Sequence, residues 1–165
     1  PYHLENSSRL QLDPEVFAGY LANIPNAIGI KFTSMDLYQM GRLKSALPAD
    51  FLLFSGADEI LCHAVLSGAT GAIGSYYNAL PGPCKYARFR AEKGDITFAR
   101  AFMMRFQDLI AETVSDMWGF LRAAVIHTSQ VDIGVPRPPL QTGKTIWPQE
   151  KIEELLAPIT ALVPE

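Results

Sequence analysis

The sequence lacks the features that mark several common classes of protein. It has only two cysteines, Cys62 and Cys84, which are too few for a disulfide framework or a zinc signature. A net charge of −3 and an isoelectric point near 5.6 do not supply the basic stripe that nucleic-acid binding requires. No apolar run approaches the roughly 18 residues of a membrane-spanning helix. The three histidines share no metal-ligand spacing, so we expect no metal, nucleic acid or membrane as a partner.

The composition is that of an ordinary folded chain. Its 165 residues fit roughly one domain. With 48% hydrophobic and 19% charged residues, the chain can bury a core. The low cysteine count is compatible with a reducing cytosol, and we expect a cytoplasmic protein. The sequence begins with Pro1 and has no signal-peptide pattern, so we expect a piece of a longer protein or a processed product.

The first half of the chain alternates between short apolar segments and amphipathic segments. Four apolar segments favour strands, at residues 2–4, 27–32, 51–54 and 72–73. Helical patterns lie between them: one starts at Asp13 and Pro14, one covers 35–47 and one covers 59–66. Strands and helices that alternate at intervals of roughly 20–25 residues predict βαβ units and therefore a parallel sheet.

From Pro83 onward the pattern is helical only. We predict helices over residues 85–93, 95–113 and 116–129, and a last helix that begins near Pro148. Residues 135–140 should be extended, because consecutive prolines exclude a helix. The apolar faces of these helices exceed what this chain need bury, so we expect self-association. Examples of such residues are Phe98, Phe102 and Phe106.

Lys31 is the most informative residue, because it lies inside a short apolar run. Burial destabilises an ammonium group, and a lysine that has lost its charge is a nucleophile whose natural target is a carbonyl. The product of that attack is a Schiff base. The simpler alternative is that Lys31 extends to solvent from the end of a strand.

Other chemically suggestive residues also fall at the carboxyl ends of predicted strands, where parallel α/β sheets gather their functional groups. They are Tyr2, His3, Thr33, Gly56, Asp58, Glu59, Gly71, Gly74 and Ser75. Structural roles explain them as well. Tyr2 would serve in a core, and Ser75 would cap a turn. Asp58 and Glu59 would interact with a helix dipole.

Three motifs taken together resemble a known family. Residues 29–33 read Gly-Ile-Lys-Phe-Thr, residues 56–59 read Gly-Ala-Asp-Glu, and residues 68–75 read Gly-Ala-Thr-Gly-Ala-Ile-Gly-Ser. This combination resembles the N-acetylneuraminate lyase and dihydrodipicolinate synthase superfamily, and residues 137–140 resemble its C-terminal signature. The resemblance covers essentially the whole chain.

The resemblance implies a fold and an assembly. The superfamily consists of class I aldolases on a (β/α)8 TIM barrel. This α/β chain would run from the end of barrel strand 5 through strand 8. Residues 1–82 would form the C-terminal half of the barrel, and residues 83–165 the last barrel helix and a C-terminal helical extension. The assembled form would be a homotetramer.

The resemblance is closer to the N-acetylneuraminate lyase branch because of Thr33, the pair Asp58 and Glu59, and the run Gly74–Asn78. It implies a lyase that cleaves N-acetylneuraminate, a sialic acid, to pyruvate and an aldehyde sugar such as N-acetylmannosamine. The partners would be the sugar acid and pyruvate, and no cofactor would be needed.

The resemblance also implies a role for each site residue. Lys31 would form the Schiff base with the keto carbon, Tyr2 would support proton transfer, and Thr33 would bind the region of the C4 hydroxyl. Carboxylates suit a polyol because each oxygen accepts a hydrogen bond from a hydroxyl. The polyol tail would be held by the Gly56 backbone, the Asp58 and Glu59 carboxylates and the Ser75 hydroxyl.

The chain departs from the family pattern in two ways. Glu5 stands where we expect proline, and Arg9 stands where we expect glycine. The segment that binds the pyruvate carboxylate in the family, after barrel strand 2, has no counterpart here. We therefore expect the 165 residues to be inactive alone, and we expect unpaired sheet edges.

Two other functions remain open at this stage. One is another pyruvate-dependent aldolase of the superfamily, acting on a 2-keto-3-deoxy sugar acid or in dihydrodipicolinate synthesis. The other is a non-catalytic remnant of a barrel that acts by association with another half-barrel. The presence of Lys31, Thr33, Asp58 and Glu59 favours an enzyme over such a remnant.

Overall fold

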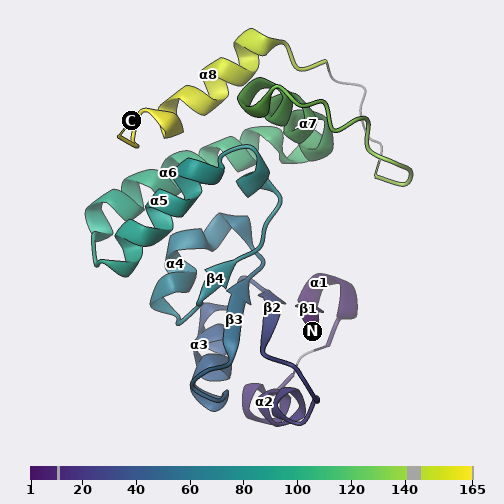
Figure 1. Ribbon diagram of the computed structural model, residues 1–165, viewed down its shortest axis with the longest axis vertical. Helices are drawn as coiled ribbons and strands as arrows, with labels where there is room; N and C mark the ends of the chain where they lie inside the picture. The colour runs from purple at the N-terminus through teal and green to yellow at the C-terminus, as the bar shows by residue number, and fades with distance from the viewer. Residues whose placement is uncertain (11, 141–145, 165) are drawn as a thin grey trace.

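The computed structural model describes residues 1–10, 12–140 and 146–164. It contains a four-stranded sheet in the order β1-β2-β3-β4, in which every pair of neighbours is parallel. The strands are β1 (Tyr2–Leu4), β2 (Gly29–Thr33), β3 (Leu52–Ser55) and β4 (Gly71–Ala72). Figure 1 shows the sheet in the lower part of the molecule, with the later helices above it. The predicted parallel α/β arrangement is confirmed.

Helices connect the strands, and aspartates define where two of them begin. The connecting helices are α2 (Pro14–Ala22), α3 (Leu37–Ala46) and α4 (Leu61–Leu66). The Asp13 carboxylate accepts a hydrogen bond from the Val16 backbone N–H at 3.0 Å. Asp36 accepts one from the Gln39 N–H at 2.9 Å. Each cap satisfies an N–H group that the first turn of a helix leaves without a partner.

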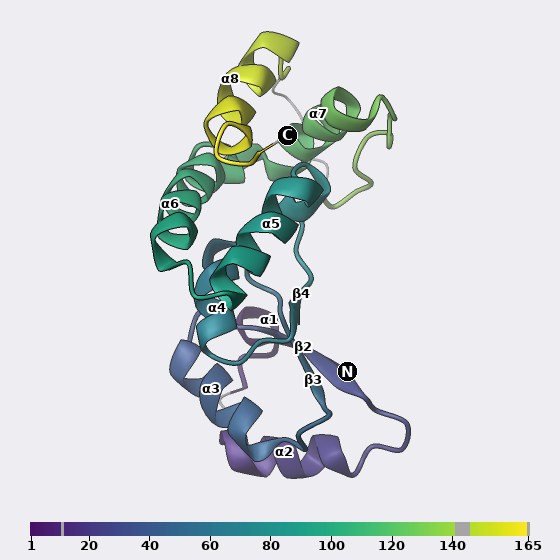
Figure 2. The same cartoon turned by 60° about the vertical axis from the view of Figure 1, so that its left-hand side comes forward.

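The two faces of the sheet differ in burial. Ile30 and Phe32 of β2 are 1% and 4% exposed and pack with Leu53 of β3 in the core beneath the connecting helices. Because side chains alternate along a strand, Lys31 and Thr33 point to the other face. Figure 2 shows α3 and α4 on one side of the sheet only. The face that carries Lys31 is therefore the face that these helices leave uncovered.

The C-terminal part of the chain forms a second core of helices. These helices are α5 (Pro81–Glu92), α6 (Ile96–Thr113), α7 (Met117–Ser129) and α8 (Gln149–Thr160). Phe102 and Phe106 of α6 and Phe120 of α7 are fully buried, and α8 contacts both helices. Our argument for self-association from Phe102 and Phe106 was therefore wrong, because the chain itself covers both rings.

Several local elements differ from the sequence expectations. Helix α5 begins at Pro81, not at Lys85, because the first turn of a helix tolerates prolines that lack an N–H donor. The segment expected as one helix over 59–66 is a 3-10 turn, η1 (Asp58–Ile60), followed by α4. The short elements α1 (Glu5–Ser8), η2 (Tyr76–Asn78) and η3 (Val114–Asp116) were not predicted.

The loop after β1 contains both residues that depart from the family pattern, Glu5 and Arg9. Glu5 is the first residue of α1, and its carboxylate accepts a hydrogen bond from the Ser34 hydroxyl beyond β2. Arg9 ends α1 with φ of 54°, in the left-handed region that glycine adopts without strain. The expected glycine therefore corresponds to a real left-handed backbone position, which arginine occupies here.

Residues 135–140 lie in no helix or strand, as their prolines predicted. They are not extended throughout, because the Leu140 N–H donates to the Arg137 carbonyl at 3.0 Å and closes a turn. Among the described residues, none of the helices is both long and apolar enough to cross a membrane.

We predict that Arg9→Gly raises the free energy of unfolding by about 0.5–1 kcal/mol, because it removes the strain of a β-carbon at positive φ. Urea denaturation measures this change. Arg9→Ala is the matched control, because it removes the same charge and keeps the β-carbon. Equal stabilisation by both substitutions would mean that the charge of Arg9, rather than its backbone conformation, is unfavourable.

Candidate functional site

Four residues of the predicted site lie together at the end of β2. Tyr2 of β1 pairs in register with Lys31 of β2, and the Lys31 Nζ lies 4.5 Å from the centre of the Tyr2 ring. The Lys31 backbone N–H donates to the Pro1 carbonyl at 3.2 Å. Thr33 ends the same strand, and Gly56 follows β3 next to it. The parallel register therefore brings the amine, the phenol and the threonine hydroxyl to the carboxyl end of the sheet.

Gly56 allows this close approach because it has no side chain. A β-carbon at Gly56 would lie 1.7 Å from the Thr33 Oγ1 and 2.8 Å from the Lys31 Cε. The Gly56 N–H donates to the Phe32 carbonyl at 3.0 Å, which extends the sheet pairing to this point. Any larger residue at position 56 must displace Thr33, Lys31 or both.

Asp58 links the ends of β3 and β4. Its side chain is 9% exposed, and its Oδ2 accepts a hydrogen bond from the Ser75 backbone N–H at 3.0 Å. Gly74 makes room for this contact, since a β-carbon there would lie 1.8 Å from the Asp58 Oδ1. The carboxylate thus positions the loop that carries Ser75.

Glu59 is more open than Asp58. It is partly exposed, and its backbone carbonyl accepts a hydrogen bond from the Gln107 side-chain amide of α6 at 2.6 Å. Glu59 and Ser75 follow neighbouring strands, so the predicted polyol-binding residues lie at the same end of the sheet as Lys31.

Burial changes the acidity of Asp58. Desolvation raises the pKa of its carboxyl to about 6, while the backbone N–H groups of Ser75 and Tyr76 and the Tyr77 hydroxyl oppose this rise by favouring the charged form. Glu59 adds a smaller upward effect through repulsion between the two carboxylates. The carboxylate therefore costs free energy to keep charged at neutral pH, which is unusual for a residue with only a capping role.

Several buried polar atoms around this edge have no hydrogen-bond partner. They are the Thr33 Oγ1, the Ser55 Oγ, the Asp58 Oδ1 and the Tyr77 hydroxyl. Buried polar groups are nearly always paired, so such a group indicates either strain or a missing partner. The sequence analysis did not single out Ser55 or Tyr77. The sequence contained a signal for both residues, since Ser55 directly precedes Gly56 and Tyr77 lies within the run Gly74–Asn78.

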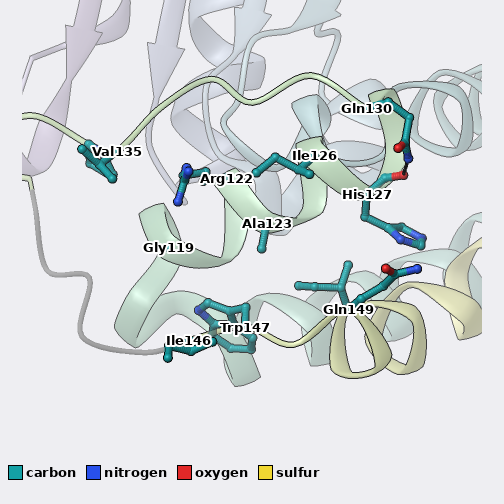
Figure 3. Close-up of a pocket in the computed structure, with 12 residues that line it drawn as sticks. Gly119, Arg122, Ala123, Ile126, His127, Gln130, Val135, Ile146, Trp147 and Gln149 are labelled. Atoms are coloured by element: carbon teal, nitrogen blue, oxygen red, sulfur yellow. Dashed lines mark hydrogen bonds between the residues drawn. The ribbon is translucent and has the colours of Figure 1, made fainter.

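The predicted site lies apart from a cavity in the C-terminal helices. This cavity, of about 460 Å³, lies beside α7 and the start of α8 and is shown in Figure 3. Its polar side chains are already engaged within the chain: Arg122 binds Asp132 at 2.9 and 2.6 Å, and Gln149 binds Glu153 at 2.7 Å. The Trp147 indole N–H donates to Asp116 at 2.9 Å. The polar groups of Arg122, Trp147 and Gln149 are thus satisfied within the chain.

A second cavity, of about 470 Å³, reaches the edge of the site. Ser75 and Asn78 line it on one side, and residues 133–140 line it on the other. Ser75 therefore belongs both to the predicted polyol-binding residues and to the lining of this cavity.

The histidines do not form a cluster. His3 is buried and stacks on Phe32 at 5.3 Å between ring centres, while His63 is exposed on α4 and His127 lies on α7. Within the described part of the chain, no three His, Cys, Asp or Glu side chains gather as metal ligands would.

Comparison with known proteins gives a consistent set of relatives. Residues 2–157 match the family described as Dihydrodipicolinate synthetase family. The N-acetylneuraminate lyase of Clostridium perfringens is 30% identical over 156 residues, which cover 94% of this chain and 51% of that protein. The mouse N-acetylneuraminate lyase is 32% identical over 144 residues, which cover 85% of this chain and 45% of that protein.

Solved structures agree with these matches. The sialic acid aldolase of Ruminococcus gnavus superposes with a TM-score of 0.82 at 25% identity, over 98% of this chain and 54% of that one. The neighbours of this chain in the family are TIM barrels. The chain spans about half the length of the relatives that it matches.

We predict that Gly56→Ala lowers the free energy of unfolding by roughly 1–3 kcal/mol, because its β-carbon overlaps Thr33 and Lys31. Urea denaturation tests this. Gly19→Ala in α2 is the matched control, since no atom lies within 4 Å of a β-carbon there. That control should be neutral or stabilising by up to about 1 kcal/mol. A Gly56→Ala variant as stable as the control would contradict the close approach.

We predict that Asp58 makes the chain less stable as the pH rises from 4 to 6. With its pKa raised to about 6, the folded chain keeps a proton that the unfolded chain has already lost. Relative to Asp58→Asn, the free energy of unfolding should fall by roughly 2 kcal/mol between pH 4 and 7.5 and level off above pH 6. A difference that does not change with pH would show that Asp58 is not desolvated.

Proposed function

The chain belongs to the dihydrodipicolinate synthetase family, and we propose from this membership that it supplies the Schiff-base-forming half of an aldolase that cleaves sialic acid. Its four strands would be the end of strand 5 and strands 6 to 8 of a (β/α)8 barrel. The observation that carries the proposal is the position of Lys31, which lies on the uncovered face of the sheet beside Tyr2, Thr33 and Gly56.

The proposed reaction begins when the Lys31 amine attacks the keto carbon of the open-chain sugar acid. A carbon–nitrogen bond forms, and the keto oxygen leaves as water, which gives an iminium ion. Cleavage of the C3–C4 bond leaves an electron pair that the iminium takes up as an enamine. The C4 hydroxyl loses its proton as that carbon becomes the aldehyde. Protonation of the enamine and hydrolysis of the imine then release pyruvate and free Lys31.

Tyr2 and Thr33 are the groups placed to move or hold protons in this reaction. The Lys31 Nζ lies 4.5 Å from the centre of the Tyr2 ring, and we assign to the Tyr2 hydroxyl the proton transfers beside the bound substrate. The Thr33 Oγ1 is buried, has no partner, and lies next to Gly56. A hydroxyl with unused hydrogen-bonding capacity fits a role in holding the C4 oxygen, which becomes the aldehyde.

The polyol tail fits the acidic and hydroxyl groups at the ends of β3 and β4. We assign it to the Gly56 backbone and to Asp58, Glu59 and Ser75. Buried polar groups that are matched to hydroxyls reject substrates that lack them. The relatives named N-acetylneuraminate lyase and sialic acid aldolase support a sialic acid as the substrate over a shorter 2-keto acid.

The chain should need a second half-barrel for turnover. Its sheet ends at β1 on one side and at β4 on the other, and it matches only about half of each relative. We propose that the pyruvate carboxylate binds to the part of the barrel that this chain lacks. We also propose a homotetramer, with pyruvate and the sugar acid as the small-molecule partners.

We predict that pyruvate forms a Schiff base with Lys31 and that borohydride reduces this Schiff base to a stable adduct. The test uses the chain and a completed barrel, in which the chain follows the N-terminal half of the Clostridium perfringens relative. Peptide mass spectrometry should find the reduced pyruvate adduct on Lys31 in the completed barrel, with at least tenfold less in the chain alone. Lys31→Arg should abolish it, because a guanidinium is not a nucleophile at neutral pH.

Lys44 provides an internal control in the same experiment, because its amine already donates to the Phe51 carbonyl at 2.9 Å. Adducts on Lys44 and Lys31 in equal amounts would indicate non-specific labelling. If neither protein forms an adduct on Lys31, the aldolase assignment fails and a barrel remnant with another role remains. Turnover of N-acetylneuraminate by the chain alone would refute the need for a second half-barrel.

A further inference from the structure

Two buried polar groups beside the site lack partners and face the same point. A β-carbon built on Gly74 would lie 1.8 Å from the Asp58 Oδ1 and 2.8 Å from the Tyr77 Cε2. Neither the Asp58 Oδ1 nor the Tyr77 hydroxyl makes a hydrogen bond. The hydroxyl is nevertheless close enough to lower the pKa of the Asp58 carboxyl. The two groups therefore interact without reaching hydrogen-bond geometry.

The Tyr77 ring is held in place from its other side. It stacks on Phe106 of α6 with 6.2 Å between ring centres and an angle of 21° between planes. Phe106 is itself fully buried in the helical core. The helical core thus holds the Tyr77 ring in place, with its Cε2 near the same point at Gly74 as the Asp58 Oδ1.

We propose that Tyr77 is a positioning residue for the polyol-binding end of the site, whose protonated hydroxyl stabilises the charged Asp58 carboxylate on its Oδ1 side. The other carboxylate oxygen, Oδ2, holds the Ser75 backbone N–H at 3.0 Å. Tyr77 therefore controls the orientation of Asp58 and, through Asp58, of the loop that carries Ser75. This inference rests on the proposed function, because it concerns the recognition of the same hydroxyl-rich tail.

The electrostatic surroundings keep the Tyr77 phenol protonated beside the Asp58 carboxylate. Burial, followed by the charge of Asp58, raises the pKa of Tyr77, so its proton stays on the oxygen at all ordinary pH values. The other titratable groups near Asp58 are Glu59 of η1, Tyr76 of η2 and Cys84 of α5. Burial raises the pKa of Cys84 as well, so the thiol keeps its proton.

Tyr76 provides a matched control in the neighbouring position. Its hydroxyl lies 2.9 Å from the Thr113 Oγ1 in the helical core and does not bind Asp58. Tyr76→Phe and Tyr77→Phe each remove one buried hydroxyl from the same short helix and keep the ring. A general effect of lost packing or polarity should appear in both variants, whereas an effect through Asp58 should appear only in Tyr77→Phe.

The decisive experiment measures the pKa of the Asp58 carboxyl by carbon-13 NMR titration of the chain. The resonance is identified by its disappearance in Asp58→Asn. Loss of the hydroxyl that stabilises the charged carboxylate should raise this pKa by roughly one pH unit in Tyr77→Phe. Tyr76→Phe should leave it within about 0.3 units of the unchanged chain. An unchanged Asp58 pKa in Tyr77→Phe would overturn the inference.

A second measurement separates this inference from the proposed function. In the completed barrel, Tyr77→Phe should raise the KM for N-acetylneuraminate roughly 3- to 10-fold and leave kcat nearly unchanged, while Tyr76→Phe should not change KM. A raised Asp58 pKa without any change in KM would also overturn the role in substrate binding. If no variant cleaves sialic acid, the proposed function fails, and the titration still decides whether Tyr77 positions Asp58.

Discussion

Parallel pairing of the four strands is the constraint on which the whole site depends. In a parallel sheet the carboxyl ends of all strands lie at the same end of the sheet, so residues that are far apart in the sequence meet there. The register places Tyr2 opposite Lys31 and Lys31 opposite Phe54, one residue before the end of β3. A shift of one residue in either pairing would turn the Lys31 side chain to the helix-covered face. Sheet register and chemistry are therefore inseparable in this chain.

Two glycines that follow β3 and β4 allow the side chains of the site to pack closely at the carboxyl end of the sheet. Gly56 admits Thr33 and Lys31, and Gly74 admits the Asp58 carboxylate. This density has an energetic consequence, because it excludes water from Asp58 and raises its pKa to about 6. The same compact arrangement that organises the site thus destabilises the charged form of Asp58 relative to an exposed aspartate. A functional requirement for that charge would explain why it is present.

The sequence predicted those features that depend on neighbouring residues. The strand patterns, the helix start at Asp13 and the positions of Lys31 and Thr33 all follow from local sequence signals. The contacts of Asp58 with Ser75 and Tyr77 were not predictable, because they join residues 17 and 19 positions apart through tertiary packing. The burial of Phe102 was missed for the same reason, since one helix does not reveal which other helices cover it.

The most direct test of the central claim is deuterium exchange into the methyl group of pyruvate in heavy water, with the completed barrel as the catalyst. An iminium on Lys31 makes the adjacent carbon acidic, and the enamine that forms takes up a solvent deuteron when it is protonated again. This account predicts exchange that requires Lys31 and is lost in Lys31→Arg. Exchange that persists in Lys31→Arg, or no exchange in a folded completed barrel, would contradict the account.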